Sequence, residues 1–343
     1  MRLNQTSPAG RTMHDVELGL DTDFIQKAHE EVLADALDSG AGEKFIRMSH
    51  RYIDGHWRKF TIKLKRFSKP LRGSTFVDYG CKFGHMVPML VSAGVSKIFA
   101  IDVADDHLAD GAKFFGQRFP VEYIQSRDCY VDIPSASADF LLANEVISHI
   151  HPTYLDTFYS EASRILRTGG EIVISDGNNW AHEQTRLDLL EWYELWERGT
   201  SKEFGTSNYE TKRRKIIASH FKDLDDQAIN YLAECTSGLW GQQIIDAVAR
   251  YLAGTKFIER RYRAGTCPVQ PSQGVVMERG FDPLQVIMAL EFSGFDAVQL
   301  LQGKPLTDMA RRGETKNFTI RGTKLPESVK LLQDRSRETF AGT

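Results

Sequence analysis

Five polar residues, each at or just after the end of an apolar run, are the side chains best suited to hold a small polar ligand: Asp78, Asp102, Asp128, Asn144 and Asp176. Carboxylate oxygens accept hydrogen bonds from hydroxyl and amino groups. The second acid follows the first by 24 residues. An acid roughly 20 residues beyond a glycine turn is placed to bind ribose hydroxyl groups. The spacing therefore predicts a nucleoside site.

A glycine turn lies between the first two acids. Gly80 and Gly84 carry no Cβ, so the backbone between them can turn tightly and approach a ligand closely. A strand at 74–77 precedes this turn and a helix at 86–93 follows it, as in nucleotide-binding loops. The strict dinucleotide pattern has a third glycine, and Lys82 stands at that middle position.

A sheet must bring these residues together. Runs of β-branched and apolar residues predict strands at 74–77, 97–102, 121–124, 138–143 and 171–175. Helical patterns fall between them, and one at 154–166 ends at a Thr-Gly-Gly sequence typical of a glycine C-cap. Alternating strands and helices predict a parallel, doubly wound α/β sheet. Ligands of such sheets bind beyond the carboxyl ends of the strands, so the five polar residues should line one crevice.

Taken in order, these motifs resemble those of the class I S-adenosylmethionine-dependent methyltransferases. Residues 78–84 resemble the first motif, an acid followed by three alternate glycines. Asp128-Cys129 resembles an Asp-Ala pair, 144–150 the strand-four motif, and Leu166-Arg167-Thr168-Gly169-Gly170 the Leu-Lys-Pro-Gly-Gly before strand five. The resemblance covers 71–177, and 280–325 more loosely. It implies a seven-stranded Rossmann-like sheet, with strand six at 296–301 and an antiparallel strand seven at 317–321.

The same resemblance implies S-adenosyl-L-methionine as cofactor. Asp102 would then bind the ribose diol, Asp128 the adenine amino group beside Cys129, and Asp78 the ammonium group. The backbone at Gly80 and Gly84 would admit the methionine portion. The other expected cofactor contacts are Cys81, His85, Val103, Asn144 and Tyr52.

Two histidines are the catalytic candidates. His149 follows strand four, at a place that faces the methyl group in many relatives, and its alternative is a structural histidine bonded to backbone. His182 follows strand five near Trp180 and could act as a general base, or be a plain surface residue. No metal is expected, and the alternative is a divalent cation held by Asn144, Glu145, Asp176 and Asn178.

About a hundred residues beyond the minimal fold separate strands five and six, and they are mostly helical. We expect an N-terminal helical arm at 1–70, a core at 71–177 and 269–325, a helical lid insertion at 178–268 and a tail at 326–343. The alternative for the insertion is a dimerisation or packing subdomain.

The N-terminal arm contains a basic run. Its members are Arg58, Lys59, Lys63, Lys65, Arg66, Lys69 and Arg72. One interpretation is a solvated helix face, and the other is a patch that meets a phosphorylated or otherwise anionic substrate.

Composition limits the function classes. A net charge of −3 and a pI of 6.4 give no general attraction to nucleic acid or anionic membrane. No run of about 18 apolar residues is present, and the four cysteines lack metal-type spacing. We expect a cytoplasmic protein whose partner is a small-molecule acceptor, with neither nucleic acid nor membrane as partner; a homo-oligomer is left open.

The predicted function is methyl transfer to an oxygen or nitrogen of a small molecule, a glycan precursor or a specialised metabolite. One alternative is a non-catalytic cofactor-binding or interaction protein with the same fold. Another is an NAD-dependent oxidoreductase, which would favour the three-glycine pattern. An enzyme that methylates adenine or cytosine in nucleic acid usually has Asn/Asp-Pro-Pro-aromatic after strand four, where this chain has Asn144-Glu145-Val146.

Overall fold

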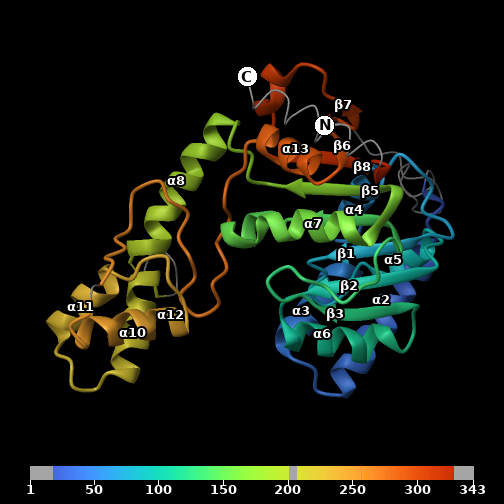
Figure 1. Cartoon of the computed structure of the whole chain (residues 1–343). Coiled ribbons are helices and arrows are strands. Elements are labelled where there is room, and N and C mark those ends of the chain that lie inside the picture. Colours follow the sequence, from blue (N-terminus) through green and yellow to red (C-terminus); the bar gives the residue numbers. More distant parts are fainter. Residues whose placement is uncertain (1–17, 201–206, 256, 328–343) are drawn as a thin grey trace, which may run out of the picture.

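An eight-stranded sheet forms the centre of the protein (Figure 1). The structure is a computed structural model that describes residues 18–200, 207–255 and 257–327. The strand order is β3-β2-β1-β4-β5-β8-β6-β7. The strands are β1 (Thr75–Tyr79), β2 (Lys97–Asp102), β3 (Val121–Gln125), β4 (Ala138–Asn144), β5 (Leu166–Asp176), β6 (Phe295–Leu301), β7 (Lys304–Pro305) and β8 (Phe318–Lys324).

The pairing confirms the doubly wound α/β prediction. Strands β1 to β5 are parallel to one another, while β8 runs antiparallel between β5 and β6. The predicted count of seven strands is wrong by one, because the two-residue β7 pairs with the end of β6. Gln302 and Gly303 join them with φ values of 50° and 85°. Two left-handed residues in a two-residue loop make the tight turn that returns the chain onto its own strand.

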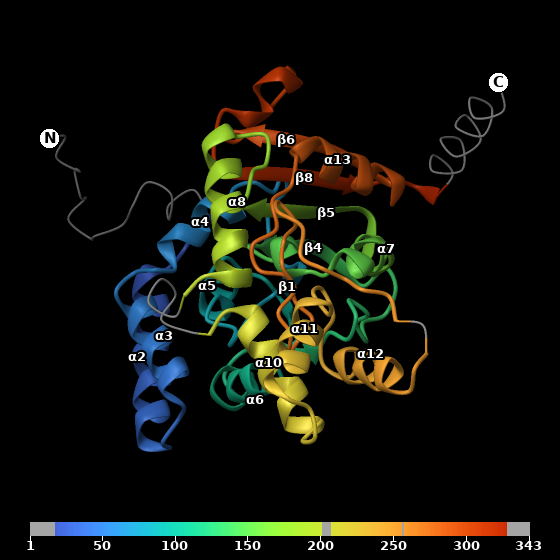
Figure 2. The ribbon, with the colours of Figure 1, turned by 90° about the vertical axis from the view of Figure 1, so that its left-hand side faces the viewer.

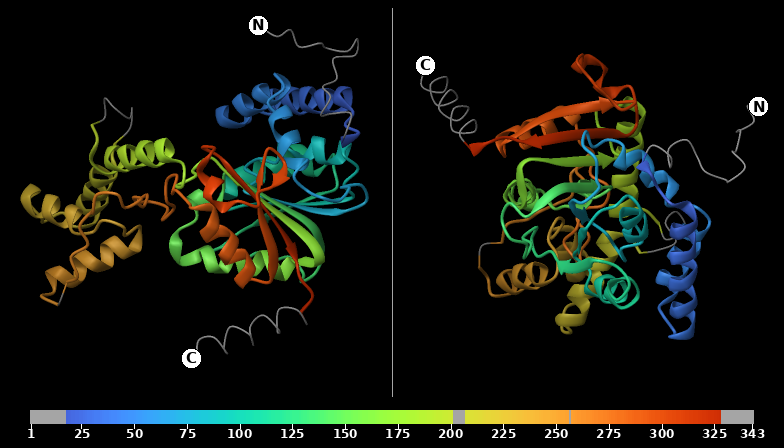
Figure 3. Two further views of the ribbon diagram at one scale, coloured as in Figure 1. Left: turned by 90° about the horizontal axis from the view of Figure 1, so that it is seen from above. Right: turned by 90° about the vertical axis from the view of Figure 1, so that its right-hand side faces the viewer.

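Helices cover both faces of the sheet (Figure 3). The N-terminal helices and α5 (Val87–Ser92) lie on one face, and α7 (Leu155–Ile165) and α13 (Pro283–Phe292) lie on the other. Successive residues of a strand point to opposite faces. Phe76 accordingly joins the core beneath the N-terminal helices, whereas Val77 joins the core beneath α7 and α13. Both side chains are fully buried, so β1 is the centre of the hydrophobic core.

The connection from α7 to β5 differs from the predicted glycine C-cap. Helix α7 ends at Ile165, and Leu166 is already extended, with φ −75° and ψ 142°. Strand β5 therefore begins before the two glycines. Gly170 remains necessary there, because a Cβ would lie 2.9 Å from the carbonyl oxygen of Arg167 and 3.0 Å from that of Asp139.

The N-terminal arm consists of three helices, α2 (Thr22–Asp38), α3 (Glu43–Ile53) and α4 (Arg58–Leu64). The side chain of Asp21 caps α2 by accepting hydrogen bonds from the amides of Asp23 and Phe24. Helices α3 and α4 are separate and not one continuous helix. The chain turns at Gly55, whose φ is 87°, and α4 then reaches the carboxyl end of β5, where Nζ of Lys63 donates to Oγ of Ser175.

The inserted residues form a helical cluster on the side of the sheet toward which the β5 arrow points (Figures 1 and 2). Its described helices are α8 (Glu183–Arg198), α10 (Tyr209–His220), α11 (Asp226–Glu234) and α12 (Gln242–Leu252). The segments that leave and rejoin the sheet are paired. The amide of Phe281 donates to the carbonyl of Asn178, and the amide of Trp180 donates to the carbonyl of Phe281, both at 2.9 Å.

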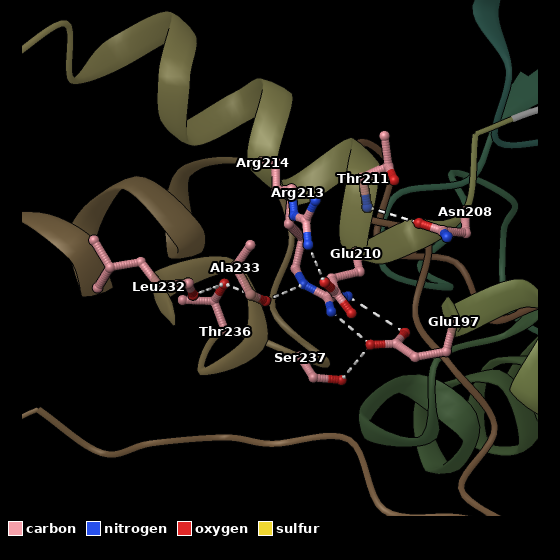
Figure 4. A network of polar contacts seen from close by, with 10 residues as sticks. All are labelled: Glu197, Asn208, Glu210, Thr211, Arg213, Arg214, Leu232, Ala233, Thr236 and Ser237. Carbon is pink, nitrogen blue, oxygen red and sulfur yellow. Dashed lines mark hydrogen bonds and ion pairs between the residues drawn. The ribbon is translucent and has the colours of Figure 1, made fainter. Parts of the chain in front are cut away.

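A buried ion pair holds the insertion together (Figure 4). Arg213 on α10 donates from Nη2 to Oε1 of Glu197 on α8 at 2.5 Å. Its Nε donates to the carbonyl of Ala233 at 2.7 Å, which ties in α11. Both charged side chains are 1% exposed. One guanidinium group thus joins three helices, in addition to the apolar cluster that Ile217, Leu232 and Ile244 form between α10, α11 and α12.

Among the described residues, none of the helices combines the length and the apolar character that crossing a membrane requires. Most of the predicted tail at 326–343, and residues 1–17 of the predicted N-terminal arm, lie outside the part of the chain that the structure describes.

Candidate functional site

The glycine turn after β1 opens at the carboxyl edge of the sheet. Gly80 and Gly84 both have φ of 81°, and Lys82 between them has φ of 56°. All three alternate positions are therefore left-handed, including the one where the family has its middle glycine. A Cβ on Gly80 would lie 2.4 Å from Cγ2 of Val146, and one on Gly84 would lie 2.1 Å from the hydroxyl of Tyr123. The missing Cβ atoms thus make room for these two side chains.

Asp102 at the end of β2 supports this turn. Its Oδ2 accepts a hydrogen bond from the amide of Lys82 at 2.8 Å. Its Oδ1 accepts from the amides of Val103 and Ala104 at 2.9 and 3.1 Å. A carboxylate offers about four acceptor positions, so one position on Oδ2 stays available to a ligand hydroxyl. Asp102 therefore shapes the turn and still presents an acceptor.

Asp78 lies beneath the turn, near the carboxylate of Asp102 and the phenol of Tyr52. Burial and, to a smaller extent, the charge of Asp102 together raise the pKa of Asp78 to about 7. No cation and no hydrogen-bond donor among the described residues contributes to that pKa. A buried carboxylate of this kind is stabilised by a cationic ligand.

Cys81 and His85 point away from the opening of the turn into packed regions. Cys81 is buried against Ala100 and Leu108. His85 is 3% exposed; its Nε2 lies 3.0 Å from Oγ of Ser49. Burial lowers the pKa of His85 well below its ordinary value. Its ring lies 5.0 Å from the ring of Tyr52, so these two predicted cofactor contacts pack on each other.

Asp128 and Cys129 form the two central residues of a tight turn after β3. Their φ values are 51° and 68°, and Arg127 and Tyr130 exchange backbone hydrogen bonds of 3.1 and 2.8 Å across them. The turn leaves the carboxylate of Asp128 exposed and buries Cys129, whose pKa burial raises to about 11. Val103 and Tyr130 are 60% and 64% exposed at the same edge of the sheet.

The end of β4 supplies Asn144, and Glu145 follows it with φ of 55°. Oδ1 of Asn144 is buried and has no hydrogen-bond partner among the described residues. Oε2 of Glu145 accepts from the amide of Gly177 at 2.9 Å. Burial and then the charge of Glu145 raise the pKa of Asp176, at the end of β5, to about 7.

No group of three or more His, Cys, Asp or Glu side chains in the described part of the chain is arranged to hold a metal ion.

The two catalytic candidates make local contacts. Nδ1 of His149 lies 3.3 Å from the carbonyl oxygen of Val276, in the segment that returns from the insertion. His182 is the N-cap of α8, where Nδ1 accepts from the amide of Thr185 at 3.2 Å. The ring of His182 is therefore held through Nδ1, and only Nε2 is left for other partners.

A pocket next to Asn144 and Glu145 was not predicted from the sequence as a site. Its volume is about 620 Å³, and it lies at the carboxyl edge between α4, the end of β6 and the residues before β8. Four lysines and arginines line it: Lys59, Lys63, Arg66 and Lys316. The basic run of the N-terminal arm was the available signal, but its partner segment lies some 250 residues away in the sequence.

The crevice fits the chemistry of S-adenosylmethionine. The cofactor has two positive groups, a ribose diol and an adenine ring. Asp78 is a buried carboxylate without a cation, Asp102 has an acceptor position left, and Oδ1 of Asn144 lacks a donor. The exposed side chains of Val103 and Tyr130 offer an apolar surface on which a purine can lie.

A comparison with protein families agrees with this fit. A family model described as a methyltransferase domain matches residues 77–174, the segment from β1 to β5. No curated protein sequence matches the chain. An S-adenosylmethionine-dependent methyltransferase structure from Mesorhizobium loti is 15% identical, covers 77% of this chain and 97% of its own, and gives a TM-score of 0.43. A structure of S-adenosylmethionine-dependent methyltransferases from Methanosarcina mazei is 15% identical, covers 77% of this chain and 98% of its own, and gives a TM-score of 0.42.

The matched segment contains the glycine turn, the acids that end β1 and β2, and the turn after β3. Outside this segment, β8 pairs antiparallel with β5, as the resemblance implied for the last strand of the sheet. Residues 77–174 therefore match a methyltransferase domain, in agreement with the resemblance of the sequence motifs, and the side chains of the crevice fit S-adenosylmethionine as its cofactor.

Proposed function

We propose that this enzyme transfers the methyl group to an oxygen or nitrogen of a small molecule, a glycan precursor or a specialised metabolite. The observation that carries the proposal is the pocket of about 620 Å³ beside Asn144 and Glu145. Small-molecule sites usually have volumes of about 300 to 1,000 Å³. The pocket adjoins the end of β4, next to the glycine turn on which Val146 packs. An acceptor bound there would lie close to the cofactor crevice.

Within this proposal the crevice residues bind the cofactor. Asp78 would neutralise its ammonium group and Asp102 would accept from a ribose hydroxyl. Asp128 would accept from the adenine amino group, with Val103 against the ring. Cys81 and His85 would act indirectly, because both side chains are packed behind the turn. When bound, the cofactor would supply a sulfonium methyl group for transfer to the acceptor.

The protein has two tasks in such a transfer. Orientation of the acceptor along the line of displacement and exclusion of water carry much of the rate. We propose that the insertion at 178–268 acts as a lid, which its position over the carboxyl edge supports (Figure 2). A base is needed only for an acceptor that loses a proton, and His149 and His182 stay the candidates. We also propose a cytoplasmic location, which four unpaired cysteines support.

The test is incubation of the full chain with methyl-labelled S-adenosylmethionine and fractionated cell metabolites. Label should pass into a small-molecule fraction. Label found only in protein or nucleic acid would overturn the small-molecule proposal. No transfer to any fraction, together with normal cofactor binding by calorimetry, would favour the alternative of a non-catalytic cofactor-binding protein.

A further inference from the structure

The pocket beside Asn144 and Glu145 has an uneven charge. Of the described residues that line it, four carry a full positive charge and one, Glu145, carries a negative charge. Glu145 already accepts a hydrogen bond from the amide of Gly177. Near neutral pH the lining therefore has an excess of three positive charges. Such an excess inside a recess costs electrostatic free energy until an anion binds.

The cations converge from two parts of the chain. Lys59, Lys63 and Arg66 are four and three residues apart, so they lie on one face of α4 and its continuation. Lys316 faces them from the segment before β8. The rest of the basic run is placed differently. Arg58 stacks on the ring of Trp57, with its guanidinium carbon 4.7 Å from the ring centre, and Nζ of Lys69 bonds to the carbonyl of Gly169.

Lys63 forms the inner end of the pocket. Its Nζ donates a hydrogen bond to Oγ of Ser175 on β5. Burial lowers the pKa of Lys63, Glu145 and Asp176 counter the fall, and Arg66 adds to it. The lysine is therefore anchored to the strand end and has carboxylates nearby.

The other three cations of the pocket, Lys59, Arg66 and Lys316, have no carboxylate in the described part of the chain that offsets their charge. None of them forms an ion pair with another residue in the described ranges. Burial alone lowers the pKa of Arg66, so no acid among the described residues stabilises its charge. The guanidinium group reaches the β6–β7 turn, where a Cβ on Gly303 would lie 2.1 Å from Nη1. A half-buried guanidinium group without an acid is suited to bind an oxyanion from two nitrogens.

We propose that this pocket binds an oxyanion, a phosphate or a carboxylate, carried by the methyl acceptor. The inference rests on the proposed function, because it assigns the substrate class of the same pocket. Lys59, Arg66 and Lys316 bind the oxyanion. The apolar side chains of Phe60 and Leu300 in the lining contact the rest of the molecule, which extends toward Asn144 and the cofactor. The acceptor is thus a small acidic metabolite.

The first experiment titrates inorganic phosphate, and separately succinate, into the full chain saturated with S-adenosylhomocysteine, at constant ionic strength, by calorimetry. At least one of the two ions should bind with a stoichiometry of one. Arg66→Gln and Lys59→Gln should each weaken that binding about tenfold or more, the loss expected for a charge-assisted hydrogen bond. Which ion binds more tightly distinguishes phosphate from carboxylate.

The matched control is Arg58→Gln, which removes the same charge from the same helix outside the pocket. It should change ion affinity by less than about twofold, and all three variants should bind S-adenosylhomocysteine as the unaltered chain does. Failure of both ions to saturate the protein would overturn the inference. A loss in Arg58→Gln equal to that in Arg66→Gln would do the same, because it would reflect net charge alone.

The second experiment separates this inference from the proposed function. Products of the labelled-cofactor incubation are resolved by anion exchange. Label in the retained, acidic fraction supports both the oxyanion site and the small-molecule function. Label only in neutral or basic metabolites overturns the oxyanion site and leaves the small-molecule proposal intact. If no metabolite is labelled, the proposed function fails, and the calorimetric titration still decides whether the pocket binds an oxyanion.

Discussion

The amide nitrogen of Lys82 lies 2.8 Å from Oδ2 of Asp102, so the glycine turn and the acid of the second strand form one unit. Lys82 keeps this hydrogen bond although a lysine replaces the glycine of the family motif. The substitution has a conformational cost, since a residue with a Cβ at φ of 56° is about 1 kcal/mol less stable than glycine there.

Lys82→Gly should therefore raise the free energy of unfolding by about 1 kcal/mol and leave the hydrogen bond to Asp102 in place. Urea denaturation measures the change. Lys82→Ala is the control, because it keeps the Cβ and removes the ammonium group, which lies near Lys44, Arg47 and Arg51. If alanine stabilises as much as glycine, repulsion among these cations is the cause and the backbone explanation is wrong.

Asp102→Ala should weaken binding of S-adenosylhomocysteine about tenfold to a hundredfold, because one charge-assisted hydrogen bond and the supported turn are both lost. It should also lower the free energy of unfolding by about 2 kcal/mol, since three backbone amides lose their acceptor. Calorimetry and urea denaturation measure the two effects. The control is Asp105→Ala, at the exposed start of the next helix, α6 (Asp105–Gly111). It should change the affinity for S-adenosylhomocysteine by less than about twofold and the free energy of unfolding by less than about 0.5 kcal/mol. Unchanged affinity in Asp102→Ala would remove the ribose assignment.

The raised pKa of Asp78 predicts a pH dependence of stability. Between its ordinary pKa of 3.8 and its folded pKa of about 7, the folded protein holds a proton that the unfolded chain has released. The contribution to the free energy of unfolding is full below pH 4 and falls as pH rises to 7. The fall is on the order of 1 kcal/mol per pH unit.

Asp78→Asn should flatten this decline in denaturation curves collected from pH 5 to pH 8. Asp176, whose pKa is also raised, makes the free energy of unfolding fall with pH as Asp78 does. Burial lowers the pKa of His29 to about 4, so His29 makes the free energy of unfolding rise with pH. The difference between the unaltered chain and the variant is therefore the quantity to compare. Affinity for S-adenosylmethionine should rise with pH through 7 in the unaltered chain and lose that rise in Asp78→Asn. Parallel curves for the two proteins would show that Asp78 is ionised throughout.

The pair of Glu197 and Arg213 predicts a local effect on the insertion. Glu197→Gln leaves a guanidinium group that is 1% exposed without its acid, at a cost of about 3 to 5 kcal/mol. Hydrogen exchange should accelerate in α10 and α11 and stay unchanged in the sheet. Glu191→Gln, on the exposed face of the same helix, should change protection by no more than about 0.5 kcal/mol. Equal exchange in the two variants would show that the pair adds nothing to the stability of the insertion.

Much of the core could be predicted from the sequence. The apolar residues of the runs at 97–102 and 138–143 are buried in the sheet, and turn residues bound both runs, so local pattern and tertiary environment agree. The acids after β1, β2 and β3 could be located because the end of a parallel strand fixes which edge of the sheet a residue reaches.

What could not be predicted depends on contacts between distant segments. Lys316 joins Lys63 only because β8 runs antiparallel beside β5, and nothing within either segment indicates this. The left-handed turn at Asp128 and Cys129 contains no glycine to indicate it. The ion pair in the insertion needs the packing of three helices before its two members can meet.

The hydrogen bonds that pair Asn178 and Trp180 with Phe281 have a consequence for the ancestry of the enzyme. They hold the segment that leaves the sheet after β5 beside the segment that returns to it before α13. A segment with such adjacent ends can be lengthened, shortened or exchanged while β5 and α13 keep their positions. Selection can therefore change the insertion, and with it the range of acceptor molecules, without changing the strand ends that bind the methyl donor.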